Sequence, residues 1–286
     1  MTSNAAHSTI PAVVLAGERP GGNALARALG IDAGVLADVA GSSCLVRVLR
    51  CLDAAAAVRG GIVCGPAEGV LARHDALTAV FADAGFQWLA PASGPAASAL
   101  AAASAIGTMP VLLTSGDHAL LRPETVDQFL RDALEQRAHS NADLLIGLVP
   151  HREVQAAFPE SKRTLLRFAD GAFCGSNLFA LLSDRARLAL EFWRRVEALR
   201  KQPWKIAAEL GTATLLRYLL RRLSVDQAMA QLSERAGCRV GWVAVHDPRA
   251  AVDVDSVADW ELASRLLAAD QVDAARSRAS AGDADL

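Results

Sequence analysis

The sequence predicts an α/β fold in which a mostly parallel sheet carries helices on both faces. Short apolar runs rich in Val, Ile and Leu alternate with segments of helical periodicity through the first half of the chain. The runs are nearly continuous in apolar residues, as strands buried on both faces are. Their alternation with helical segments is typical of parallel strands that are joined by helical crossovers.

Six of the apolar runs are predicted as strands, and helices separate the first five. The predicted strands are residues 12–16, 61–64, 86–90, 110–114, 143–149 and 239–245. The helices between them are residues 44–56, 67–84, 96–106 and 123–138. The pattern then changes to a mixed segment, 151–182, which has no clear period.

Helices dominate the part of the sequence that follows the mixed segment. Two are predicted at residues 184–200 and 205–222, and the second has leucines spaced for one buried face. Ser224 and Gln227 form a capping-box signature for a further helix at 225–236. Ser256 and Asp259 form a similar signature before the last helix.

We therefore expect one α/β domain over residues 10–268 with a helical insertion at 184–236. The flanking residues, 1–9 and 269–286, are small and polar, and we expect them to be disordered tails.

Composition narrows the functional class. With 286 residues, 52% of them hydrophobic, the chain can bury a large core. A net charge of -2 gives no indication of a nucleic-acid or anionic-membrane partner. We see neither a run long enough to span a membrane nor a signal peptide. The five cysteines are odd in number and form no CxxC pair, which favours a reduced, cytoplasmic protein.

The stretch IPAVVLAGERPGGNALARALG, residues 10–30, has a strand, a glycine-rich turn and a helix in succession. It lacks the Lys-Ser/Thr of a Walker A loop and the GxGxxG of a dinucleotide fingerprint. Backbone N–H groups of such a turn can nonetheless bind a phosphate, and Arg19 adds a bidentate donor. The alternative is an ordinary turn in which Glu18 and Arg19 face solvent.

The stretch PVLLTSGDHALL places Asp117 just beyond a predicted strand. Ligands of open α/β sheets bind at the carboxyl ends of strands. A single carboxylate there suits Mg²⁺ that is also held by substrate phosphates. Alternatively, Asp117 caps the helix that begins at Pro123 or stabilises the turn. His118 is interpreted as a hydrogen-bonded turn residue rather than a ligand.

The stretch AVDVDSVADWELASRLL offers a second carboxylate for the same cation. We expect one of Asp253 and Asp255 to point into the cleft. Asp259 falls in the first turn of the following helix, where a negative charge interacts favourably with the helix dipole. The alternative makes Asp255 a turn residue just before Ser256.

Taken together, these motifs resemble those of the nucleotidyltransferases related to the molybdenum-cofactor guanylyltransferases and to the sugar-phosphate and methylerythritol-phosphate cytidylyltransferases. The matching elements are LAG-x-R-x-GG, V-A-G with a helix after it, T-S-G-D-H-x-L-L, and V-D-V-D-S-x-x-D-W-E-L-A. They cover most of residues 10–150 and then 239–268.

The resemblance implies a Rossmann-like three-layer α/β/α sandwich. It also implies attack by a phosphate or hydroxyl on the α-phosphate of a nucleoside triphosphate, CTP or GTP, with release of pyrophosphate. The second substrate would be a small-molecule acceptor, and a homodimer would be compatible with the family.

The resemblance assigns roles to individual residues. The nucleotide would be bound by Leu15, Ala16, Gly17, Arg19, Gly21, Gly22, Ser93 and Ser98, with the two serines in the loop near the base. Asp117 and Asp255 would hold Mg²⁺, and Arg19 and Asp117 would be catalytic.

The sequence departs from the family at one lysine, which relatives carry shortly before the V-A-G element. The aligned position is Gly34, and no lysine occurs in the first 161 residues. Arg19 or Arg27 would have to replace its charge, although arginine and lysine are not equivalent. Lys162 and Arg163 are candidates for acceptor binding from the second half, the alternative being a solvated loop.

Two other functions remain open on the sequence. The missing lysine fits a catalytically degenerate nucleotide-binding regulatory protein. A glycosyltransferase of related fold would use an aspartate pair, but the D-x-D that such enzymes usually carry near the middle of the sequence is absent here. The basic stretch FWRRVEALRKQPWK fits recognition of an anionic acceptor or a solvated helix face.

Overall fold

The computed structural model describes residues 9–18, 22–199, 202, 205, 208–209 and 211–282. Its strands form a sheet of eight in the order β3-β2-β1-β4-β7-β5-β8, with β6 paired to β7. The strands are β1 (Ile10–Leu15), β2 (Val58–Cys64), β3 (Phe86–Leu89), β4 (Val111–Ser115), β5 (Leu144–Pro150), β6 (Leu166–Phe168), β7 (Gly171–Leu181) and β8 (Val240–Ala244).

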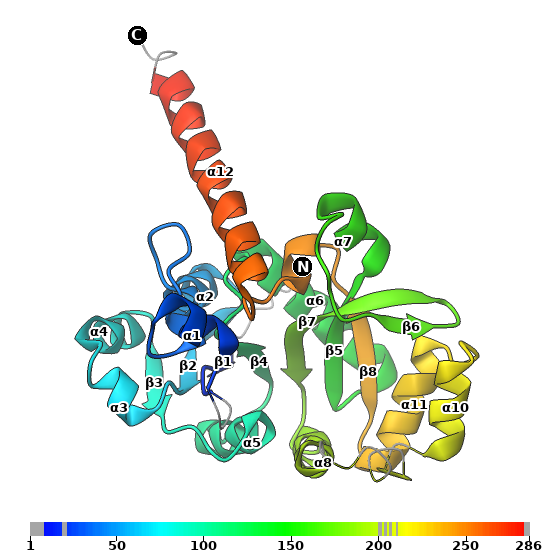
Figure 1. Ribbon diagram of the computed structural model, residues 1–286. Helices are drawn as coiled ribbons and strands as arrows, with labels where there is room; N and C mark the ends of the chain where they lie inside the picture. The colour runs from blue at the N-terminus through cyan, green and yellow to red at the C-terminus, as the bar shows by residue number, and fades with distance from the viewer. Residues whose placement is uncertain are drawn as a thin grey trace, which may run out of the picture.

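Helices cover both faces of this sheet, which gives three layers (Figure 1). One face is covered by α2 (Cys44–Ala54), α4 (Asp75–Asp83), α6 (Pro123–Ser140) and the start of α12 (Val257–Gly282). The other is covered by α5 (Pro95–Ile106), α8 (Ala186–Ala198) and α11 (Val225–Ala236). Along β1, Ala12 and Val14 belong to the first core and Val13 to the second, as the alternation of a strand requires.

Shorter elements complete the described part of the protein. They are α1 (Ala24–Leu29), η1 (Gly34–Leu36), α3 (Glu68–Leu71), α7 (His151–Ala157), α10 (Thr212–Leu219) and η2 (Pro248–Ala251).

The strand order reverses at β1. From β1 the chain proceeds outward to β2 and β3, then returns to place β4 on the other side of β1, and all three pairings are parallel. Leu15 at the end of β1 is level with Ser115 at the end of β4. The loops that follow these two strands therefore diverge and leave a crevice, the usual ligand site of open α/β sheets.

The mixed segment contains two strands that the sequence pattern did not reveal, β6 and β7. β7 is antiparallel to both β4 and β5 and lies between them. Its sequence, GAFCGSNLFAL, interrupts the apolar run with Gly, Ser and Asn, residues that favour turns. The helix α7 was also not predicted.

The six predicted strands and the Ser224–Gln227 capping box are confirmed. The predicted helix at 67–84 is divided into α3 and α4, and of the helix at 205–222 the described part is α10. The prediction of a disordered tail from residue 269 is wrong up to Gly282, because α12 continues to that residue and projects from the rest of the protein (Figure 1). This segment is rich in alanine, which has the highest helix propensity. Residues 1–8 and 283–286 lie outside the description.

Among the described residues, every helix is too short or too polar to serve as a membrane-spanning segment.

Candidate active site

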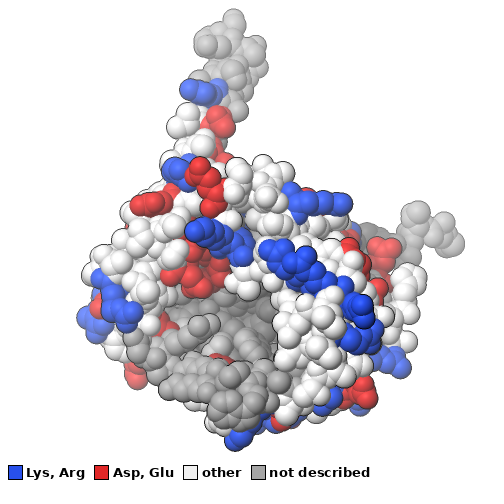
Figure 2. Space-filling model, turned by 45° about the vertical axis from the view of Figure 1, so that its right-hand side comes forward, with Lys and Arg blue, Asp and Glu red and all other residues white. Residues whose placement is uncertain are grey.

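A pocket of about 480 Å³ lies at the carboxyl ends of β1 and β4. Its walls come from the glycine turn, the 91–98 loop, the end of β4, β7, α8 and the segment before α12. Among the described residues its wall carries five carboxylates and neither Lys nor Arg: Glu18, Asp117, Glu197, Asp253 and Asp255. Figure 2 shows a hollow with acidic side chains on its upper rim, which agrees with a cleft that gathers carboxylates.

The described part of the glycine turn lies where the sequence predicted it. Leu15, Gly17 and Gly22 line the pocket, while Ala16 is buried behind them and donates its N–H to Cys64 O at 2.8 Å. A Cβ on Gly17 would lie 2.9 Å from Cβ of Pro91, so this turn packs tightly on the 91–98 loop. Arg19 and Gly21 lie outside the described residues.

The end of the turn is built to begin a helix. Gly22 has φ +77°, which an L side chain rarely adopts. Asn23 then caps α1, because its side-chain oxygen accepts the N–H of Leu25 at 2.8 Å and of Ala26 at 3.3 Å. A Cβ on Gly22 would lie 3.7 Å from Nη1 of Arg27, which places this guanidinium beside the turn.

Asp117 lies two residues after β4, half-buried on the pocket wall with its Oδ1 shielded from solvent. Its carbonyl accepts the N–H of Ala119, and its Oδ1 has no hydrogen-bond partner among the described residues. Burial raises the pKa of Asp117 to about 7, and the charges of Asp255 and Asp253 add to the rise. The helix-cap alternative is wrong, because the N-cap of α6 is Arg122.

His118, the next residue, is fully buried. Burial lowers the pKa of its imidazole to about 4, so the ring is neutral at pH 7. The side chain does not line the pocket, and neither ring nitrogen has a hydrogen-bond partner among the described residues, so the predicted hydrogen bond of His118 is not found.

Both Asp253 and Asp255 line the pocket, whereas we expected only one of them to do so. Residues i and i+2 of an extended segment share a face, and Val254 between them is fully buried. The N–H of Val254 donates to Asp117 O at 3.0 Å, so a backbone hydrogen bond holds the two acidic segments together.

The carboxylate oxygens in this pocket are suitable ligands for a Mg²⁺ ion. Mg²⁺ takes one or two protein carboxylates and completes its shell with waters and substrate phosphates. Asp117 and Asp255 both line the pocket and their charges interact, and the buried Oδ1 of Asp117 accepts no hydrogen bond from the described residues. No cluster of three or more His, Cys, Asp or Glu occurs in the described part of the protein, so the remaining ligands would come from substrate and water.

The predicted base loop forms another part of the pocket wall. Ser93 and Ser98 line the pocket, and Ser98 Oγ also accepts the N–H of Ala92 at 2.9 Å, which shapes the loop. Gly94 is the N-cap of α5, and Glu197 of α8 accepts the N–H of Ala96 at 3.3 Å. The insertion therefore reaches back to the first half of the sequence.

Sequence reasoning missed the residues that β7 and α8 bring to the pocket. Asn177 and Phe179 come from β7, and Trp193 and Glu197 come from α8. The rings of Phe179 and Trp193 are stacked, with centroids 6.4 Å apart. Asn177 has φ +52°, a conformation that is uncommon outside glycine and often marks functional sites. The only signal in the sequence was the turn-like GSN within an apolar run.

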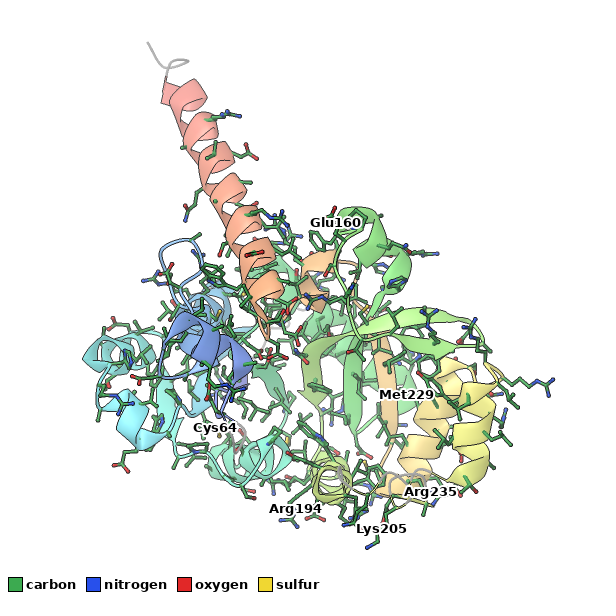
Figure 3. The ribbon with its side chains drawn as sticks, viewed as in Figure 1. Cys64, Glu160, Arg194, Lys205, Met229 and Arg235 are labelled. Atoms are coloured by element: carbon green, nitrogen blue, oxygen red, sulfur yellow. The ribbon has the colours of Figure 1, made fainter. Side chains whose placement is uncertain are left out.

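The two candidates for acceptor binding have different environments. Lys162 is exposed on the loop after α7, and it is not among the pocket-lining residues. Arg163 has a side chain that is only 7% exposed and forms ion pairs with Asp253 and Asp259. On the basic helix, Arg194 lies on the outer side of α8, away from the sheet (Figure 3).

Gly34, aligned with the lysine of relatives, leaves no room for a side chain. Its N–H donates to the Glu18 carboxylate, and a Cβ would collide with the side chain of Asn23. The side chain of Asn23, which caps α1, thus occupies the space that a side chain at position 34 would need.

A family model, the MobA-like NTP transferase domain, matches residues 12–169. A structure from Thermus thermophilus described as a hypothetical transferase is 30% identical, with a TM-score of 0.72 over 88% of this chain and 99% of that one. No curated protein sequence matches.

Two more distant structures share the fold. A CMP:2-keto-3-deoxy-manno-octonic acid synthetase complexed with CTP is 15% identical, with a TM-score of 0.53 over 92% of this chain and 99% of that one. A 4-diphosphocytidyl-2C-methyl-D-erythritol synthase from Anaerococcus prevotii is 12% identical, with a TM-score of 0.54 over 91% and 96%. The chain therefore belongs to the family of MobA-like NTP transferase domains and is a nucleotidyltransferase.

Proposed function

We propose that this protein is a Mg²⁺-dependent enzyme that transfers a nucleoside monophosphate from an NTP to a phosphorylated or hydroxyl-bearing metabolite and releases pyrophosphate. The observation that carries the proposal is that Asp117 and Asp255 line the same pocket as the glycine turn and are close enough for their charges to interact. Two carboxylates at the carboxyl end of β4 suit a cation that is shared with a triphosphate.

The glycine turn supplies the phosphate site. Backbone N–H groups between Gly17 and Gly22 bind phosphate oxygens, and Arg19 and Arg27 add positive charge there. Asp117 and Asp255 hold Mg²⁺, which when bound neutralises charge that develops on the transferring phosphate. Because the pocket wall is acidic, the pocket needs the positive charge of Mg²⁺, Arg19 and Arg27 to bind a triphosphate.

The reaction requires little covalent help from the protein. An acceptor oxygen forms a bond to the α-phosphorus, and the bond from that phosphorus to the pyrophosphate oxygen breaks on the opposite side. The protein contributes by orienting the two substrates in line. The acceptor enters over β7 and α8, where Asn177 offers an amide and Trp193 an aromatic face, and Lys162 and Arg163 were predicted to assist.

The base lies in this proposal against the 91–98 loop, with Ser93 and Ser98 as hydrogen-bonding groups. The fold of two cytidylyl-type relatives supports CTP, and the resemblance seen in the sequence allows GTP as well. We place the enzyme in the cytoplasm, because all five cysteines are free thiols and buried.

Pyrophosphate release with each of the four NTPs against a panel of phosphorylated sugars and alcohols tests the proposal. We expect one NTP and one acceptor class to give Mg²⁺-dependent turnover that Asp117→Asn and Asp255→Asn abolish. Gln128→Ala, an exposed change on α6 far from the pocket, is the matched control. Binding of an NTP without turnover on any acceptor would instead favour a regulatory protein.

A further inference from the structure

Three aspartates line the pocket that contains the candidate cation site, whereas Mg²⁺ needs only one or two protein carboxylates. Asp117, Asp253 and Asp255 all reach the pocket, and Asp259 follows in the first turn of α12. The described residues that line this pocket include neither Lys nor Arg. An interaction is therefore needed that prevents Asp253 from coordinating the cation while Asp255 coordinates it.

Arg163, which does not itself line the pocket, forms ion pairs with two of these carboxylates. Its Nη1 lies 2.7 Å from Oδ1 of Asp253, and its Nη2 pairs with Oδ1 of Asp259. Nη1 also donates to the carbonyl of Asp253 at 3.3 Å, and Nε donates to Ser161 Oγ at 2.9 Å. One guanidinium thus engages both ends of the segment that carries Asp255.

The guanidinium of this network is shielded from solvent, although the side chain of Asp253 is 34% exposed. The Arg163 side chain is 7% exposed, and that of Asp259 is 16% exposed. Asp259 Oδ2 accepts the N–H of Ser256 at 3.1 Å and its hydroxyl at 2.6 Å, so the cap of α12 is part of the same network. The planar guanidinium of arginine holds two carboxylates in a fixed geometry, whereas the freely rotating ammonium of lysine fixes their geometry less well.

We infer that Arg163 is a positioning residue for the metal centre: it neutralises Asp253 and fixes residues 253–259 so that Asp255 faces Asp117. This inference rests on the proposed function, and it reassigns Arg163 from acceptor binding to support of the cation site. Groups that orient metal ligands typically change metal affinity or activity by about 10–100-fold when removed.

The network also connects the cation site to the loop that carries Arg163 and Lys162. Residues 158–165 have no regular structure except a turn, and Arg163 is what ties them to the start of α12. Figure 3 shows Glu160, on this loop, above the sheet on the side where α12 begins. The loop also carries the exposed Lys162, so Arg163 links the cation site to the loop predicted to meet the acceptor.

The test compares Arg163→Met and Arg163→Lys with the wild type by titrating the full-length protein with Mn²⁺, an oxygen-seeking substitute for Mg²⁺. We expect Arg163→Met to weaken Mn²⁺ binding and Mn²⁺-dependent NTP binding by about 10–100-fold and Arg163→Lys to recover part of this. Asp255→Asn should remove Mn²⁺ binding, whereas Asp253→Asn should leave it close to wild type.

Arg249→Met is the matched control. Arg249 also ties a preceding segment to α12, through its ion pair with Asp270, but it lies outside the pocket. We expect it to lower the melting temperature without a change in Mn²⁺ affinity.

Three results would overturn the inference. The first is an Arg163→Met protein that has a lower melting temperature but binds Mn²⁺ and NTP with wild-type affinity. This result would show that the role of Arg163 is merely structural. The second is a change confined to the KM of the acceptor. The third is Mn²⁺ binding that Asp253→Asn removes and Asp255→Asn retains. Because the metal titration needs no turnover, absence of activity in the wild type would count against the proposed function alone.

Discussion

Replacing Asp117 by Asn should stabilise the metal-free protein while it removes metal-dependent nucleotide binding. Desolvation of this half-buried carboxylate, together with the nearby charges of Asp255 and Asp253, raises its pKa from 3.8 to about 7. Since the pKa in the folded state lies above the unfolded value, the group favours folding at low pH. That contribution is lost as pH rises through about 7, and at pH 8 the ionised carboxylate opposes folding.

The size of the effect follows from this shift. A rise of roughly 3 pKa units corresponds to roughly 4 kcal/mol at about 1.4 kcal/mol per unit. The amide that replaces the carboxylate still leaves a buried polar group without a partner, which costs about 1–3 kcal/mol. The net gain at pH 8 is therefore about 2 kcal/mol, and it raises Tm by roughly 4–8 °C at about 2–4 °C per kcal/mol.

Thermal unfolding in EDTA at pH 5 and pH 8 measures this gain. We expect Asp117→Asn and the wild type to melt close together at pH 5 and to diverge at pH 8, with the variant higher. Added Mn²⁺ should stabilise the wild type at pH 8 and leave the variant unchanged. A variant that melts below the wild type in EDTA at pH 8, or that binds Mn²⁺ and NTP normally, would refute the reasoning.

Three further substitutions address the phosphate site. Gly22→Ala should reduce NTP affinity in calorimetry, whereas Gly30→Ala, at the similar φ of +65° in the C-cap of α1, should reduce only Tm; equal affinities would remove Gly22 from the site. Arg27→Gln should raise the KM for NTP, because its guanidinium lies beside the turn, and an unchanged KM would show that it takes no part. Gly34→Lys should lower stability by about 1–3 kcal/mol and not raise turnover, because its Cβ collides with the Asn23 cap, and a faster enzyme would contradict this.

The parts of the fold that depend on local patterns could be predicted from the sequence. Buried parallel strands read as continuous apolar runs, and the Ser224 cap has a fixed spacing, so both were found. β7 was missed because its interior position depends on pairing with β4 and β5, not on its own composition. The extent of α12 was underestimated because a polar, alanine-rich segment has the composition of both a helix and a tail.

The candidate site divides in the same way. Asp117 and Asp255 belong to motifs, and both line the pocket. Glu197 meets the α5 N-terminus across a separation of 101 residues, and no local pattern reports such a contact. Arg163 resembled a solvated loop residue, and its partner Asp253 lies 90 residues further on.

Transfer of radiolabel tests the central claim most directly. The enzyme, Mg²⁺ and the acceptor identified by pyrophosphate release would be incubated with NTP labelled with ³²P at either the α- or the γ-phosphate. Transfer of a nucleoside monophosphate predicts that α-label appears in the acceptor product and that γ-label appears only in pyrophosphate. Appearance of γ-label in the acceptor, or of neither label with any acceptor while NTP still binds, would contradict the account.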